Sequence, residues 1–185
     1  HKRDYMEYHA DRFHDHSLLF YTGEELVAVL PAHIKGKSLC SHNGLTYGGL
    51  LLTHNTTTAL VIEIFDALQG YLTSETEVDT LIYKPTPHIY HSYPCEEDLY
   101  ALFRNNARLT ECKVSSAIGL GDPLPMKGRR RLTAAMKSRL HIVEDENFAA
   151  FWQVLEERLR EKYGVSPVHS LEEIRLLHSR FPENI

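Results

Sequence analysis

Three short stretches of the sequence carry the side chains best suited to bind a ligand or to react. The first is Tyr47-Gly48-Gly49. Its two glycines would let a ligand or a second chain approach the backbone closely, and Tyr47 offers both a hydroxyl and an aromatic ring. A simple β-bulge explains the same residues equally well. The sequence therefore leaves a binding site and a bulge open at this position.

The second stretch contains His88 and His91, with Tyr90 between them. Histidine changes charge near neutral pH, so the two imidazoles could line a cleft and exchange protons with a substrate. The same rings could instead pack as half-buried aromatics. We keep both histidines as candidate binding residues beside this plainer interpretation.

The third stretch is basic and contains Arg129, Arg130 and Arg131. These arginines lie in a run from Lys127 to Arg139 that has six positive charges and no acid. Guanidinium groups suit phosphates of a cofactor, a nucleotide-linked precursor or tRNA, although such runs are also common on solvated helix faces. Because 25 acids outnumber 20 Lys and Arg, for a net charge of −5, the composition disfavours nucleic acid as the main partner.

The twelve histidines do not form a metal-binding motif. His9, His14 and His16 are close in sequence, but their spacing differs from the i, i+4 pair of a helical zinc site. No metal is expected there.

The number and spacing of the cysteines indicate the redox environment in which the protein folds. Cys40, Cys95 and Cys112 are odd in number and lack C-x-x-C spacing, which predicts neither a disulfide framework nor a cysteine zinc site and favours a reducing, cytoplasmic location. No apolar stretch approaches the ~18 residues of a membrane span, so none is expected.

The first part of the chain predicts an antiparallel meander followed by alternating helices and strands. Strands are expected over 17–21, 25–34, 38–42 and 45–52. A helix capped by Asn55 or Thr56 should follow, end within 70–73, and bury Val61, Ile64, Phe65 and Leu68. The pattern then predicts a strand over 78–83, a helix from Glu96 with Leu99, Leu102 and Phe103 facing inward, and a strand over 109–118.

A loop over 119–125, rich in glycine and proline, marks the expected joint between residues 1–125 and residues 126–185. After it we expect a basic helix over 128–140, a short strand over 141–143, and a helix that ends at Gly164. That helix should bury one apolar stripe, made of Phe148, Phe151, Trp152, Leu155 and Leu159. Ser170 and Glu173 form a capping box for the last helix. The order predicts an α+β fold with a mixed, mainly antiparallel sheet and an incomplete second unit.

The sequence resembles the FemAB-like putative acetyltransferases of the GNAT acyltransferase superfamily. Three segments show the resemblance: LPAHIKGKSLCSHNGLTYGGLLL, PHIYHSYPCEEDLYALFRNNARL and PVHSLEEIRLLHSRFPENI. The resemblance implies two GNAT-like halves, of which this chain would hold the first and the opening of the second. It implies transfer of an acyl or aminoacyl group to an amine. Acetyl-CoA or another acyl-CoA would bind to the missing C-terminal half, so this chain alone should be inactive.

GNAT enzymes hold the donor pyrophosphate with an R/Q-x-x-G-x-G/A loop, because a glycine-rich loop at a helix N-terminus leaves backbone N–H groups free for anions. The corresponding stretch here is LTHNTTTA, residues 52–59, which has no glycine. Thr56, Thr57 and Thr58 could donate hydroxyls to an anion or simply cap the helix. The resemblance therefore implies a degenerate first half that does not bind the donor.

Two further interpretations stay open. The chain could be a noncatalytic platform for an anionic acceptor or a nucleotide-linked precursor, using the Tyr47 region and the basic helix. It could also contact nucleic acid such as tRNA, which the acidic composition disfavours. In either case, the stripe around Phe148 should pack against the first half or cause self-association with another copy.

Overall fold

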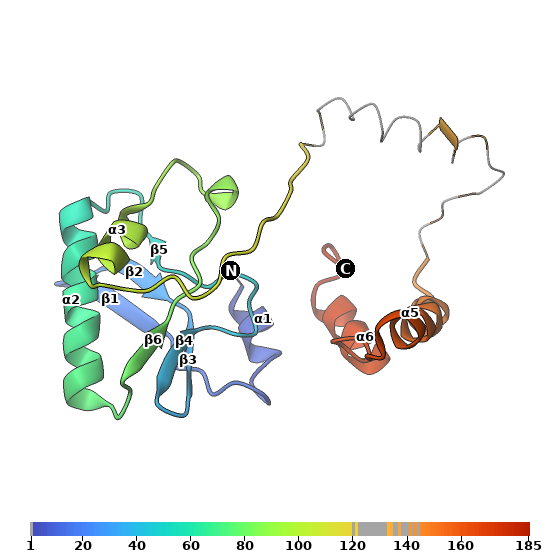
Figure 1. Cartoon of the computed structure of the whole chain (residues 1–185), viewed down its shortest axis with the longest axis horizontal. Helices are drawn as coiled ribbons and strands as arrows, with labels where there is room; N and C mark the ends of the chain where they lie inside the picture. Colours follow the sequence, from blue (N-terminus) through green and yellow to red (C-terminus); the bar gives the residue numbers. More distant parts are fainter. Residues whose placement is uncertain are drawn as a thin grey trace. The chain divides into compact units, whose positions relative to one another are not determined.

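The computed structural model describes residues 2–119, 121, 133–134, 137, 141, 143 and 145–185. Contacts between residues divide the chain into two compact units, His1–Cys112 (unit 1) and Lys113–Ile185 (unit 2), and each is described by itself (Figure 1). The expected joint at 125/126 and Arg129, Arg130 and Arg131 lie outside the described residues. The expected loop over 119–125, basic helix over 128–140 and strand over 141–143 lie largely or partly outside them.

Unit 1 opens with a short helix and a β-hairpin. The helix is α1 (Arg3–Glu7), and the hairpin joins β1 (Leu18–Thr22) to β2 (Glu25–Leu30) in antiparallel pairing. Gly23 adopts a φ of +61° in the connecting turn, a conformation that glycine reaches without steric cost. The predicted hairpin is confirmed.

Pro31 divides what the sequence predicts as one strand over 25–34. The chain continues as β3 (Ala32–Lys35), which pairs with β4 (Ser38–Ser41) in a second sheet. Proline has no N–H to donate to a ladder, while its carbonyl accepts a hydrogen bond from the His42 amide at 3.0 Å. The single strand is therefore wrong, because the proline interrupts the ladder and its two parts join different sheets.

The strand expected over 45–52 is reduced to β5 (Leu51–Leu52). The amides just before it have other partners: Gly48 N–H donates to the Lys84 carbonyl at 3.2 Å, and Leu50 N–H donates to the Tyr83 hydroxyl at 2.6 Å. A single meander is consequently not formed. One sheet has the antiparallel order β1-β2-β5, and the other has the order β3-β4-β6.

Helix α2 (Thr58–Glu75) packs against both sheets (Figure 1). Its buried residues are those predicted from the sequence, namely Val61, Ile64, Phe65 and Leu68. Leu68 joins Leu30 and Leu39 in one cluster, whereas Ile64 joins Val27 and Ala28 in another. The helix extends two residues beyond the predicted end and connects to β6 (Thr80–Ile82), which runs parallel to β4.

Helix α3 (Glu97–Arg104) follows the short 3₁₀ helix η1 (His88–Tyr90), but its inward face is not the predicted one. Ala101 is the buried residue and packs with Val61 and Phe65 of α2, whereas Phe103 is 78% exposed. Two residues along a helix turn by about 200°, so a helix that buries Ala101 turns Phe103 outward. Leu99 is exposed as well, and Leu102 alone of the predicted trio packs against this cluster.

The strand expected over 109–118 does not form. Leu109, Val114 and Ile118 are all exposed. Alternation of polar and apolar residues gives a strand only when a neighbouring strand completes the ladder, and no described strand pairs with this stretch.

In unit 2 the structure describes two helices, α5 (Phe148–Tyr163) and α6 (Leu171–Arg180). The predicted end signals are confirmed, since Gly164 caps α5 with a φ of 67° and Ser170 and Glu173 form a complete capping box for α6. Trp152 of the predicted stripe is buried, but Phe151 is 61% exposed. Phe148, Trp152, Leu155 and Leu159 share one face at i, i+4, i+7 and i+11, and Phe151 lies at its margin.

The fold is thus of the predicted mixed α+β class, with small sheets flanked by helices. None of the helices in the described part of the chain combines the length and the apolarity needed to cross a bilayer.

Candidate functional site

Two of the predicted sites in unit 1 come together in space. Tyr47 lies in the segment that leaves β4 and returns at β5, and its ring centroid is 5.6 Å from that of Tyr90 in η1. Tyr90 lies between His88 and His91, so the tyrosine of the first candidate site meets the segment of the second. We call Tyr47, His88, Tyr90 and His91 the tyrosine–histidine face.

Lys84 holds the segment that leads to Tyr47. Its amide donates to the Ser41 hydroxyl at 2.7 Å, and its ammonium group donates to the carbonyls of His42 and Leu45 at 3.2 and 2.8 Å. Burial lowers the pKa of Lys84. The lysine therefore satisfies carbonyls of its own chain, which fixes the turn that precedes Tyr47.

Gly48 and Gly49 are required by the packing of the chain on itself. A Cβ atom at Gly48 would lie 3.1 Å from the amide nitrogen of His42, and one at Gly49 would lie 3.0 Å from the Tyr83 hydroxyl and 3.1 Å from Cα of Pro85. The close approach predicted at these glycines is thus made by neighbouring segments. Neither glycine lies in a strand, so no ladder surrounds them as a bulge would require.

His91 is the residue of this face with the clearest acid–base potential. Its Nε2 lies 2.9 Å from the Thr86 carbonyl, which can only accept, so Nε2 carries the proton. In the neutral ring Nδ1 is then a proton acceptor, and it is buried without a hydrogen-bond partner. Thr86 Oγ1 and Glu97 Oε2 are also buried without partners. His91 is therefore the candidate general base among these residues, while the exposed His88 makes no such contact.

Tyr83 and Asp98 form a second polar group that sequence reasoning missed. The Tyr83 hydroxyl donates to Asp98 Oδ2 at 2.7 Å while it accepts from the Leu50 amide at 2.6 Å. Burial, together with the adjacent carboxylate, raises the pKa of Tyr83, so the hydroxyl stays protonated. The only signal in the sequence was the acidic start of α3, and nothing local connects it to Tyr83 fifteen residues earlier.

Cys95 is not an activated nucleophile. Burial and the facing Glu97 carboxylate raise the pKa of Cys95 to about 11, so the thiol is protonated at neutral pH. The hydrogen bond from this thiol lowers the pKa of Glu97. The thiol therefore acts as a hydrogen-bond donor to Glu97 and not as a nucleophile.

The segment over 52–59 does not have the features of a pyrophosphate loop. Thr57 accepts a hydrogen bond from the Leu60 amide at 3.3 Å as the N-cap of α2, and Thr53 and Thr56 hydroxyls lie 3.0 Å apart. Thr56 also donates to the Val27 carbonyl at 3.4 Å. The cap is thus Thr57, and the prediction of Asn55 or Thr56 as the cap is wrong, because the helix begins at Thr58 and Thr56 bonds to Thr53 and Val27 instead. The hydroxyls of Thr56 and Thr57 are therefore engaged within the chain.

The histidines near the N-terminus are dispersed. His16 Nε2 lies 2.9 Å from the Tyr71 hydroxyl, whereas His9 packs among Tyr5, Tyr8 and Phe13. Among the residues that the structure describes, no three His, Cys, Asp or Glu side chains are placed to hold a metal ion.

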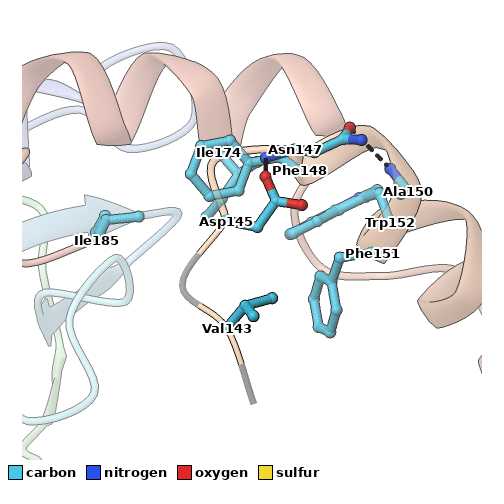
Figure 2. A pocket seen from close by; sticks show the side chains of 9 residues that line it. All are labelled: Val143, Asp145, Asn147, Phe148, Ala150, Phe151, Trp152, Ile174 and Ile185. Carbon is cyan, nitrogen blue, oxygen red and sulfur yellow. Dashed lines mark hydrogen bonds between the residues drawn. The ribbon is translucent and has the colours of Figure 1, made fainter. Parts of the chain in front are cut away.

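Unit 2 contains an open pocket of about 470 Å³ (Figure 2). Its lining is mostly apolar and consists of Val143, Asp145, Asn147, Phe148, Ala150, Phe151, Trp152, Ile174 and Ile185. Asp145 accepts a hydrogen bond from the Asn147 amide at 2.9 Å, and Trp152 donates to the His169 carbonyl at 3.1 Å. The polar groups thus hold the chain in place, and the pocket is the uncovered part of the predicted apolar stripe. Packing of that stripe against unit 1 or another copy stays a prediction.

Comparison with known proteins gives no further assignment: no family model, no curated protein and no solved structure matches the chain.

Proposed function

We propose that this chain is the N-terminal part of a FemAB-like, GNAT-fold acyltransferase that moves an acyl or aminoacyl group to an amine, and that unit 1 does not hold the donor itself. The order of elements supports the first half of the proposal. Antiparallel strands are followed by α2 and by a strand, β6, that runs parallel to β4.

The proposal that unit 1 does not hold the donor depends on the hydrogen bonds made within the segment over 52–59. Its threonine hydroxyls cap α2 and bond to one another and to the Val27 carbonyl, and no glycine exposes backbone N–H groups to an anion. Acetyl-CoA or another acyl-CoA would therefore be bound by residues outside unit 1.

Calorimetric titration of the chain with acetyl-CoA tests this proposal. We expect no saturable heat at micromolar concentrations and no transfer of the acetyl group to added amines. Micromolar binding that is lost when Thr56→Val removes a hydroxyl, but kept when the exposed Thr22→Val is made in β1, would contradict the proposal.

A second candidate function is a noncatalytic platform for an anionic acceptor or a nucleotide-linked precursor. It is favoured by the juxtaposition of Tyr47 and Tyr90, because aromatic rings beside imidazoles can stack on a base or sugar and meet a phosphate. The expected ligand class is a UDP-linked cell-wall precursor.

Titration with a UDP-linked muropeptide tests the platform with a matched pair of variants. Tyr90→Ala should weaken binding about 5- to 150-fold, because stacking of one base on an aromatic ring contributes about 1–3 kcal/mol. Tyr163→Ala in unit 2 should not change it, although the two tyrosines are equally exposed, at 63% and 62%. Equal effects of the two substitutions, or salt-sensitive tRNA binding alone, would exclude this candidate.

A further inference from the structure

A cluster of buried imidazoles, distinct from the tyrosine–histidine face, joins three segments of unit 1. His9 follows α1, His33 lies in β3, and His42 follows β4; they are 5%, 1% and 1% exposed. The ring centroids of His33 and His42 are 5.5 Å apart, and the Phe13 ring lies 4.9 and 5.6 Å from them. We call these four residues the imidazole cluster.

Backbone hydrogen bonds fix the protonation state of two of these rings. The Asn43 amide donates to Nδ1 of His33 at 3.3 Å, and the Gly44 amide donates to Nδ1 of His42 at 3.1 Å. A ring nitrogen accepts only when it carries no proton, so both imidazoles are neutral. A proton added at either Nδ1 would place two donors against each other in a buried site, and that hydrogen bond would be lost.

The groups around the cluster oppose protonation. Burial lowers the pKa of His42 to about 4, with His33, His9 and Lys84 acting in the same direction and Asp15 opposing them. Burial also lowers the pKa of His33, with Lys84 and Lys35 contributing. Cys40 beside them adds no negative charge at neutral pH, since burial raises the pKa of its thiol.

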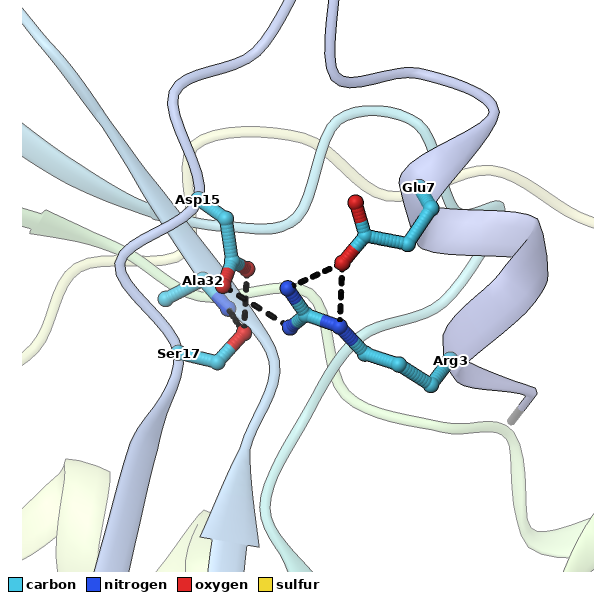
Figure 3. Close-up of polar contacts among 5 residues, drawn as sticks. All are labelled: Arg3, Glu7, Asp15, Ser17 and Ala32. Carbon is cyan, nitrogen blue, oxygen red and sulfur yellow. Dashed lines mark hydrogen bonds and ion pairs between the residues drawn. The ribbon is translucent and has the colours of Figure 1, made fainter.

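Two segments of unit 1 contact this cluster, the turn after β4 and the segment after α1. The turn from His42 to Leu45 closes with a 3.0 Å hydrogen bond from the Leu45 amide to the His42 carbonyl, and it leads directly to Tyr47. The segment after α1 packs on that turn through His9, since a Cβ at Gly44 would lie 2.6 Å from the His9 ring. The N-terminal segment has a second attachment in which Arg3 binds Asp15, and Asp15 accepts from Ser17 (Figure 3).

We propose that the imidazole cluster is an acid-sensitive latch: protonation of His42 releases the turn over 43–45 and the segment after α1, and so withdraws Tyr47 from Tyr90. This inference concerns a conformational change and goes beyond the proposed function. It can therefore be tested independently of acyl transfer and of acceptor binding.

The direction of the pH effect follows from linkage. His42 has a pKa of about 4 in the folded chain and about 6.5 when unfolded. The neutral ring therefore stabilises the latch fully above pH 6.5, and this contribution is lost as the pH falls from 6.5 to 4. Over that range the ratio of closed to open forms should fall by up to about 300-fold.

NMR of the full chain between pH 7.5 and 3.5 tests the latch. We expect the His42 ring to titrate with a midpoint near 4 and the Asn43 and Gly44 amides to lose exchange protection over the same range, while the β1–β2 amides stay protected. Titration of His42 near its ordinary pKa with Gly44 still protected would overturn the proposal. So would a single step in which all unit 1 amides lose protection together.

Three variants, one of them a control, sharpen the test. His42→Asn keeps an acceptor near the Gly44 amide but cannot take up a proton, so Gly44 should stay protected down to pH 3.5. His14→Asn, which changes an exposed histidine of the same segment, should behave as the original chain. Gly44→Ala should displace the His9 ring and open the segment after α1 at neutral pH without acid. An unchanged His9 spectrum in that folded variant would also count against the latch.

Discussion

Units 1 and 2 differ in how they bury apolar side chains. Unit 1 places α2 across two small sheets and surrounds Leu30, Leu39 and Val61 completely. The described buried apolar residues of unit 2 are three, Trp152, Leu177 and Phe181, and Phe151 remains exposed beside an open pocket. Unit 1 therefore encloses apolar side chains between a helix and two sheets, whereas the described part of unit 2 buries only a few between two helices.

The difference explains where chemistry can be positioned. The tyrosine–histidine face of unit 1 lies on segments held by Lys84, Tyr83 and the glycines Gly48 and Gly49, so its side chains have fixed neighbours. The pocket of unit 2 is shaped by few contacts and has one carboxylate, Asp145. A binding site needs side chains held in place by surrounding contacts, and in unit 1 such contacts hold the segment that carries Tyr47.

The largest expected loss of stability comes from shortening a buried side chain in the core of unit 1. Leu39→Ala removes a side chain with no exposed surface and should lower the free energy of unfolding of unit 1 by about 2–5 kcal/mol. Phe151→Ala in unit 2 should cost less than about 1 kcal/mol, because that ring is mostly exposed.

Chemical denaturation can follow the two units separately. Trp152 is the only tryptophan and reports on unit 2, while nine of the ten tyrosines lie in unit 1. Leu39→Ala should shift the tyrosine signal and leave the tryptophan transition in place. If both signals shift together by the same amount, the contrast between the units is wrong.

The next largest loss of stability is expected when the Tyr83 hydroxyl is removed. Tyr83→Phe leaves the Leu50 amide without its acceptor and Asp98 without its donor, and should destabilise unit 1 by about 1–3 kcal/mol. Tyr21→Phe changes an exposed ring in β1 and serves as the control. Thermal unfolding measured by circular dichroism would decide, and equal melting temperatures for the two variants would contradict the assigned role.

Loss of the α6 capping box should have a smaller effect, confined to unit 2. Ser170→Ala deletes the acceptor for the Glu173 amide and should cost about 1 kcal/mol. The measurement is the midpoint of the Trp152 fluorescence transition in urea. Ser179→Ala, near the end of the same helix, should leave that midpoint nearly unchanged.

The smallest effects, opposite in sign, are expected from two glycines. Gly70 lies within α2 with open space where a Cβ would be, so Gly70→Ala should stabilise unit 1 by about 0.5–1 kcal/mol. Gly164 has a positive φ at the end of α5, so Gly164→Ala should destabilise unit 2 by about 1 kcal/mol. Denaturation midpoints that move in the same direction would show that backbone conformation does not control these positions.

Local signals in the sequence predicted local structure well. The buried face of α2, the capping box at Ser170 and the glycine cap at Gly164 depend on residues within a few positions of one another, and all three are confirmed. Strand extent depends on distant partners. The stretch over 109–118 alternates as a strand does, yet no described strand pairs with it.

The candidate site was predictable in part. Tyr47 and the His88–His91 segment stand out by residue type, but their contact depends on how β6 and η1 are placed beside the segment before β5. The Tyr83–Asp98 hydrogen bond and the imidazole cluster join residues far apart in sequence. No local sequence pattern predicts such contacts, because only the folded structure brings these residues together.

An NMR titration of the labelled chain tests the central claim, that unit 1 offers an acceptor face and no donor site. Acetyl-CoA and a UDP-linked muropeptide would be added separately, and the amides over 56–60 and 47–50 followed. We expect acetyl-CoA to leave the first set unshifted and the muropeptide to shift the second. Saturable shifts over 56–60 with acetyl-CoA, and none over 47–50 with the muropeptide, would contradict the claim.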